Sequence, residues 1–136
     1  AYRMEHVLKQ CVECIRHALP EVAVVYLFGS AASGQMHANS DIDLAVYSSQ
    51  KLEKLPLWDL SQKLAVIAGR DVDLIDLHAA SSVLRMQVIS SGKHLLCVDR
   101  ALCEQFEDFV FSDYARLNEE RSAILADIHQ RGSVYG

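Results

Sequence analysis

Two short motifs, separated by ten residues, combine residue types that can hold phosphate and metal ions. The first is Gly29-Ser30, which directly follows the apolar run VAVVYLF at 22–28. A glycine at the end of a strand permits a tight turn and a close approach of the backbone to a ligand. Ser30, at the start of a following helix, adds a hydroxyl beside exposed N–H groups and a positive dipole end. This corner is therefore a candidate phosphate-binding site.

The second motif is Asp41-Ile42-Asp43, in the stretch DIDLAVY at 41–47, where carboxylates and apolar residues alternate. Two carboxylates at positions i and i+2 of a strand lie on one face and repel each other unless a cation lies between them. Magnesium prefers one or two carboxylates together with substrate phosphates and water. We therefore expect Asp41 and Asp43 to hold Mg²⁺ next to a phosphate bound at the first motif.

A third carboxylate would complete a site for two metal ions and help to deprotonate an incoming hydroxyl. The stretch DVDLIDL at 71–77 offers Asp71, Asp73 and Asp76. Asp73 lies in the middle of this predicted strand, between two apolar residues, and is our choice. The other two are expected to be solvated ends of the strand.

Hydrophobic periodicity predicts helices and strands in alternation around these motifs. Helices are predicted at 3–19, about 56–69, 80–91 and about 101–130, with a short one opening at Ser30 and a frayed tail at 131–136. Strands are predicted at 22–28, 41–47, 71–77 and 93–99, the last at an edge of the sheet. No linker or repeat interrupts them. We expect residues 1–136 to form one α/β domain, a small central sheet flanked by helices, with a long C-terminal helix.

Composition limits the classes of partner. The 136 residues contain 13 Lys and Arg against 18 Asp and Glu, a formal net charge of -5, and 51% are hydrophobic. An acidic chain is a poor candidate for tracking nucleic-acid phosphates, which depends on Lys and Arg. No apolar run reaches the roughly 18 residues of a membrane span, and the first residues lack a secretory signal's apolar segment. We expect a cytoplasmic protein that binds neither nucleic acid nor membrane.

The four cysteines are predicted to be free, partly buried thiols in a reducing compartment. Cys11 and Cys14 form a C-x-x-C pair, but Cys97 and Cys103 do not provide the second matched pair that a zinc site needs.

The order FGS, SDIDLAV and DVDLIDL resembles the minimal nucleotidyltransferases of the DNA polymerase beta superfamily over most of the chain. Within it the pattern is most similar to MntA-type antitoxins, which are encoded beside a HEPN-domain RNase toxin and transfer AMP from ATP to a toxin tyrosine. The resemblance implies the polymerase-beta-like fold with a small mixed sheet, ATP as substrate and such a toxin as partner. It also implies that Gly29 and Ser30 bind the nucleotide phosphates. Asp41, Asp43 and Asp73 would then bind two Mg²⁺ ions, with Asp73 as the base.

This chain lacks a positively charged residue that members of the family often have. Members often carry arginine between the Gly-Ser pair and the next glycine, whereas this chain has Ala31-Ala32-Ser33. His37, Lys63, Arg70 or a residue of the partner are candidates to replace it.

Two other functions stay open at the level of sequence. One is transfer to a small molecule held between two copies, as in the aminoglycoside nucleotidyltransferases of the same superfamily. The other is an antitoxin that acts by binding alone. A protein acceptor is favoured because the chain has little beyond its last predicted strand with which to hold a small one. The aromatic residues of the last helix are a candidate partner surface, with Phe111 as the best single anchor: Phe106, Phe109, Phe111 and Tyr114.

Overall fold

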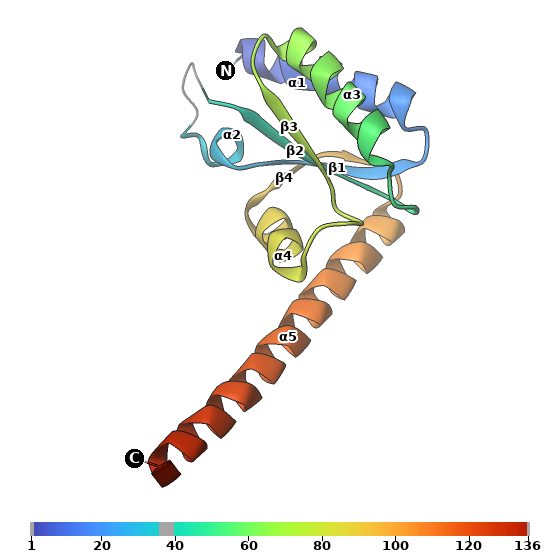
Figure 1. Cartoon of the computed structure of the whole chain (residues 1–136). Helices are drawn as coiled ribbons and strands as arrows, with labels where there is room; N and C mark the ends of the chain where they lie inside the picture. The colour runs from blue at the N-terminus through green and yellow to red at the C-terminus, as the bar shows by residue number, and fades with distance from the viewer. Residues whose placement is uncertain (1, 36–39, 136) are drawn as a thin grey trace.

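The computed structural model describes residues 2–35 and 40–135 and confirms the predicted alternation of helices and strands (Figure 1). Most boundaries agree with the predictions to within one or two residues. The elements are α1 (Tyr2–Ala18), β1 (Val22–Phe28), α2 (Ser30–Ser33), β2 (Ile42–Ser48), α3 (Lys54–Ala68), β3 (Val72–Asp76), α4 (Ser82–Ser91), β4 (Lys93–Cys97) and α5 (Arg100–Tyr135).

The four strands form one mixed sheet in the order β3-β2-β1-β4. β1 is antiparallel to both β2 and β4, whereas β2 and β3 are parallel. The C-terminal end of β1 therefore lies beside the N-terminal ends of β2 and β3, at one end of the strands. β4 lies at the outer edge, as predicted.

Each face of the sheet is covered by its own helices (Figure 1). On one face, α1 and α3 pack over a cluster that includes Ile15, Leu44 and Leu64, all fully buried. On the other face, α4 and the first part of α5 pack over a cluster that includes Tyr26 and Val110. Alternate residues of β2 contribute to the two clusters, with Leu44 and Val46 on the first face and Ala45 on the second, as the strand period requires.

The last helix extends far beyond the sheet. The prediction of a frayed tail from residue 131 onward is wrong as far as residue 135. α5 has 36 residues and continues to Tyr135 (Figure 1). A single glycine in the last turns does not stop a helix, because its cost relative to alanine is only about 1 kcal/mol. Of the apolar side predicted for this helix, Phe106 and Val110 are buried, whereas Ile124, Leu125 and Ile128 are exposed.

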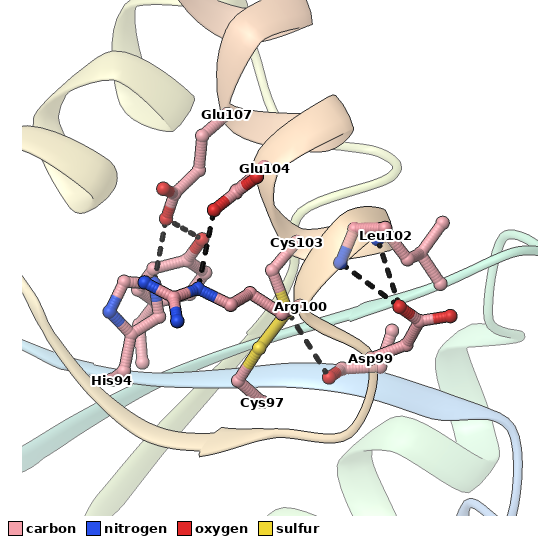
Figure 2. Close-up of a disulfide and its surroundings, with 11 residues drawn as sticks. His94, Cys97, Asp99, Arg100, Leu102, Cys103, Glu104 and Glu107 are labelled. Carbon is pink, nitrogen blue, oxygen red and sulfur yellow. Dashed lines mark hydrogen bonds and ion pairs between the residues drawn. A yellow bond between two sulfur atoms is a disulfide. The ribbon is translucent and has the colours of Figure 1, made fainter.

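The prediction of free thiols is wrong for two of the four cysteines. Cys97, at the end of β4, forms a disulfide with Cys103, in the first turns of α5 (Figure 2). The chain reverses direction between them, which brings their Cα atoms to 6.5 Å, within the range that a disulfide spans. Cys11 and Cys14 are free, and burial raises the pKa of the Cys11 thiol to about 11, with a smaller contribution from Cys14.

A polar cluster also ties α5 to the sheet. Glu107 accepts a hydrogen bond of 2.6 Å from the buried Tyr26 hydroxyl and pairs with His94 Nε2 at 2.7 Å (Figure 2). Asp99 caps the start of α5 by accepting from the backbone N–H groups of Ala101 and Leu102. The first half of α5 is thus fixed by covalent, polar and apolar contacts. No helix in the described part of the chain is long and apolar enough to cross a membrane.

Candidate active site

The meeting point of three strand ends brings two of the predicted carboxylates side by side. In the ladders Asp43 lies opposite Phe28 of β1 and beside Asp73 of β3. Paired residues of neighbouring strands point to the same face, so Asp43 and Asp73 lie on the face that α4 and α5 cover. Asp41 precedes the first residue of β2 and is exposed, while Asp43 is half-buried. The ladder thus brings Asp43 and Asp73 together, while Asp41 lies two residues before Asp43 and outside the strand.

Gly29 brings the backbone against the Asp43 carboxylate. Its φ angle is +71°, in the region that favours glycine, and it occupies the position before the first residue of α2. A methyl group added at Gly29 would overlap Oδ2 of Asp43. Ser30 then begins α2, as predicted, and its carbonyl accepts a hydrogen bond from the Gln35 N–H at 3.1 Å. The first motif therefore adjoins the second, and a side chain at residue 29 would force the Asp43 carboxylate to move.

The electrostatics of the site favour a bound cation. The pKa of Asp43 is raised above its ordinary value by burial first, then by the negative charges of Asp73 and Asp41. A metal ion beside Asp43 would relieve both this repulsion and the cost of burying its charge.

The residues fit an open magnesium site rather than a closed cage. In the part of the chain that the structure describes, no three His, Cys, Asp or Glu residues are close enough to form a complete metal-binding group. Magnesium sites that are completed by substrate phosphates and water need only one or two protein carboxylates. Asp43 with its two acidic neighbours meets that requirement.

The two other carboxylates of the 71–77 stretch have different surroundings. Asp71 is exposed at the start of the strand, as predicted. Asp76 is only 6% exposed and accepts hydrogen bonds from the backbone N–H groups of Leu52 and His78 at 2.9 and 3.0 Å. The prediction that Asp76 is a solvated end is therefore wrong, because the chain between β2 and α3 passes over the end of β3. Its role is structural.

The candidates for the missing positive charge lie in different places. Ala31 and Ala32 of α2 pack on the core, so this helix presents no cation to the site. Lys63 belongs to α3, on the opposite face of the sheet from Asp43. Arg70 donates a hydrogen bond of 3.3 Å to the Ser40 carbonyl, next to Asp41, which leaves it as the candidate nearest the site. His37 lies outside the described residues.

The sequence analysis did not single out Phe28 as a neighbour of the carboxylates. Its side chain packs at the rim of the cluster under α4 and α5 and is half-buried. The alternation of β1 could have assigned it a face, but its position opposite Asp43 depends on strand register, which one sequence does not fix.

Comparison with known proteins agrees with this geometry. Residues 9–101 match the family model described as Polymerase beta, Nucleotidyltransferase. The chain is 41% identical over 117 residues to the protein adenylyltransferase MntA of Shewanella oneidensis, covering 86% of this chain and 84% of that protein. It is also 41% identical over 46 residues to a spectinomycin 9-adenylyltransferase of Staphylococcus aureus, covering 34% of this chain and 18% of that protein.

Solved structures show the same similarity. A crystal structure of a toxin-antitoxin with AMP-PNP matches with a TM-score of 0.81 and 40% identity, over 89% of this chain and 97% of the matched chain. The complex of tri-AMPylated Shewanella oneidensis HEPN toxin with MNT antitoxin matches with a TM-score of 0.75 and 36% identity, over 90% of this chain and 95% of the other.

Proposed function

The chain belongs to the polymerase beta nucleotidyltransferase family, and from this we propose that it is an antitoxin that adenylylates a cognate HEPN-domain toxin. The reaction transfers AMP from ATP to a protein hydroxyl, which the resemblance assigns to tyrosine, and so neutralises the toxin. The observation that carries the proposal is the position of Asp43, between Asp73 on one strand and the Gly29 turn on the other side.

Binding of ATP is proposed where the end of β1 lies beside the starts of β2 and β3. The Gly29-Ser30 corner would receive the β- and γ-phosphates through the backbone N–H groups at the start of α2. The α-phosphorus would then lie over Asp43. A solved relative with AMP-PNP supports ATP as the nucleotide.

The chemical step is an in-line displacement at the α-phosphorus. A bond forms between the acceptor oxygen and phosphorus, the bond to the pyrophosphate oxygen breaks, and the acceptor proton passes to the Asp73 carboxylate. Asp73 suits this role because it lies beside Asp43 on the side away from Gly29. In an in-line displacement the nucleophile enters opposite the leaving group, so it enters next to Asp73 if pyrophosphate leaves over the glycine turn. Asp41, Asp43 and Asp73 would hold the Mg²⁺ ions, two in our proposal, which supply positive charge for the developing and leaving oxygens.

Protein partners are proposed to contact α5. Of the aromatic residues predicted as a partner surface, Phe106 is 5% exposed and belongs to the core, whereas Phe109 and Phe111 are 56% and 46% exposed. Phe109 is therefore as good an anchor as Phe111. Relatives solved as toxin–antitoxin complexes support a protein partner. We place the reaction in the cytoplasm, where ATP is available.

Transfer of label from ATP tests the class of acceptor. The purified chain is incubated with Mg²⁺ and ATP labelled at the α-phosphate, either with the protein encoded beside it or with spectinomycin. We expect label on the protein and none on the drug, because the match to the spectinomycin enzyme covers only a third of this chain. Label on spectinomycin alone would establish the small-molecule function, and a stable unlabelled complex would establish inhibition by binding.

A further inference from the structure

Phe28 lies in the same cross-strand row as the proposed catalytic carboxylates. It is paired with Asp43, which is paired in turn with Asp73, so the row runs Phe28, Asp43, Asp73 across three strands. Directly opposite residues of antiparallel strands have Cβ atoms about 5 Å apart on the same face. The ring therefore lies on the catalytic face, immediately beside Asp43.

Packing within the fold buries only part of the Phe28 ring. Phe28 packs against the edge of the cluster under α4 and α5, but it is half-buried, whereas Tyr26, two residues earlier on the same face, is 1% exposed. Part of an aromatic surface thus remains accessible next to three carboxylates. An apolar surface at such a place can contact the apolar part of a substrate that the charged groups hold.

The direction of the in-line displacement indicates which part of the substrate the Phe28 ring can contact. Pyrophosphate leaves over the Gly29 turn in the proposed reaction, and the acceptor enters from the opposite side, next to Asp73. Phe28 is on the β1 side of Asp43, away from the acceptor, and precedes the glycine turn directly. Within reach of its ring are the nucleoside attached to the α-phosphorus and the phosphates themselves, and only the nucleoside has an apolar surface.

We propose that Phe28 is a nucleoside-binding residue, whose ring contacts the ribose and adenine of ATP and makes the site prefer a nucleotide to an inorganic polyphosphate. This inference rests on the proposed function. Contact between an aromatic side chain and a base contributes about 1–3 kcal/mol in single-stranded nucleic-acid complexes, which corresponds to roughly a fivefold to hundredfold change in affinity.

Calorimetric titration of the full chain with Mg²⁺ and either AMP-PNP or inorganic tripolyphosphate tests the proposal. We expect Phe28→Leu to weaken AMP-PNP binding about tenfold and to leave tripolyphosphate binding within about twofold. Trp58→Leu is the control, because Trp58 is a 59% exposed aromatic residue on α3, on the opposite face of the sheet, and it should leave both affinities unchanged. Phe28→Tyr, which keeps the ring, should retain AMP-PNP binding.

Each other outcome overturns the inference. Equal losses for both ligands, or no loss for either, would show that the ring does not contact the nucleoside. An unchanged AMP-PNP affinity with a raised KM for the protein acceptor would assign the ring to the acceptor instead. If Phe28→Leu does not fold, NMR of the wild-type complex replaces it: nuclear Overhauser contacts are expected between the Phe28 ring and adenine H8 or ribose H1′, and their absence contradicts the proposal. A wild-type chain that binds neither ligand would refute the proposed function itself.

Discussion

At the scale of single residues, the charge on Asp43 is costly for the folded chain and useful to the proposed reaction. Burial and two neighbouring carboxylates raise its pKa above the ordinary value of 3.8. The folded state therefore binds this proton more tightly than the unfolded state does. Ionisation of Asp43 lowers stability as the pH rises from below 3.8 to above the folded pKa, and the cost is absent at lower pH.

The variant Asp43→Asn should therefore be more stable than the wild type in the absence of Mg²⁺. We expect a higher midpoint of thermal unfolding at pH 7, and a difference that shrinks as the pH is lowered through the folded pKa. Asp71→Asn is the matched control, because Asp71 is exposed and is not among the groups that raise the pKa of Asp43. A wild type more stable than Asp43→Asn at pH 7 without Mg²⁺ would contradict the electrostatic account.

Gly29→Ala should abolish AMP transfer, because the new methyl group overlaps the Asp43 carboxylate. Gly69→Ala is the comparison for an alanine at a positive φ angle without a steric overlap: its φ angle is +67°, against +71° at Gly29, but a methyl group there meets nothing within 4 Å. Gly69, with ψ 22°, is in the left-handed helical region, where alanine costs roughly 1–2 kcal/mol. Gly29, with ψ -150°, is in a region that is essentially restricted to glycine, so Gly29→Ala should lose more stability. Transfer assays should show activity in Gly69→Ala only, and an active Gly29→Ala enzyme would be inconsistent with the site.

Residue types and strand alternation were enough to predict the carboxylates that meet at the site. Asp73 could be chosen over Asp71 because it lies mid-strand between Val72 and Leu74, so its side chain is on the face opposite to those core residues. The burial of Asp76 could not be predicted, because it depends on where the 49–53 segment passes. Phe28 was missed for a similar reason, since its partner is fixed by register.

At the scale of elements, the disulfide between β4 and α5 is the most testable contact. It closes a short loop, with a sequence separation of 6. Loss of such a crosslink is expected to cost about 2 kcal/mol by the chain-entropy relation. Cys97→Ser should therefore lower the free energy of unfolding by about this amount relative to the oxidised wild type.

Denaturant unfolding with and without dithiothreitol measures this effect. Reductant should destabilise the wild type and leave Cys97→Ser unchanged. AMP transfer should be similar in both, because Cys97 lies opposite Val24, well along β1 from the glycine turn. Identical unfolding of the wild type in both conditions would mean that the two cysteines do not pair.

The two parts of α5 should respond differently to the same kind of substitution. Val110 is fully buried against the sheet, whereas Ile128 is 57% exposed. Val110→Ala should cost about 2 kcal/mol of unfolding free energy, from lost burial and a cavity, while Ile128→Ala should cost less than about 0.5 kcal/mol. Urea titrations measure both. A large cost for Ile128→Ala would show that the projecting part packs against another part of the chain.

Periodicity predicted α5 but not which part of it is buried. The apolar spacing continues past Val110 to Ile128, so the pattern alone suggests one long core face. Where burial stops depends on the width of the sheet, which is a property of tertiary structure. The disulfide was missed because the turn that joins Cys97 to Cys103 is set by the packing of α5.

At the scale of the whole molecule, the sheet assembles the site from segments that are distant in sequence. The site combines residues 28–30, 41–43 and 73. These segments meet because β1 is antiparallel to β2 while β3 is parallel to it. The α/β class and the edge strand could be predicted from residue patterns, and the mixed sheet from the family resemblance. The strand register and the raised pKa of Asp43 required the folded chain.

The intact mass of the partner protein tests the central claim most directly. The protein encoded beside this chain is incubated with ATP, Mg²⁺ and either the wild type or Asp43→Asn, and its mass is recorded. The account predicts one or more added AMP groups with the wild type, and a rate of addition lower by about a hundredfold or more with the variant. Equal modification of the partner by both proteins would contradict the assignment of the active site.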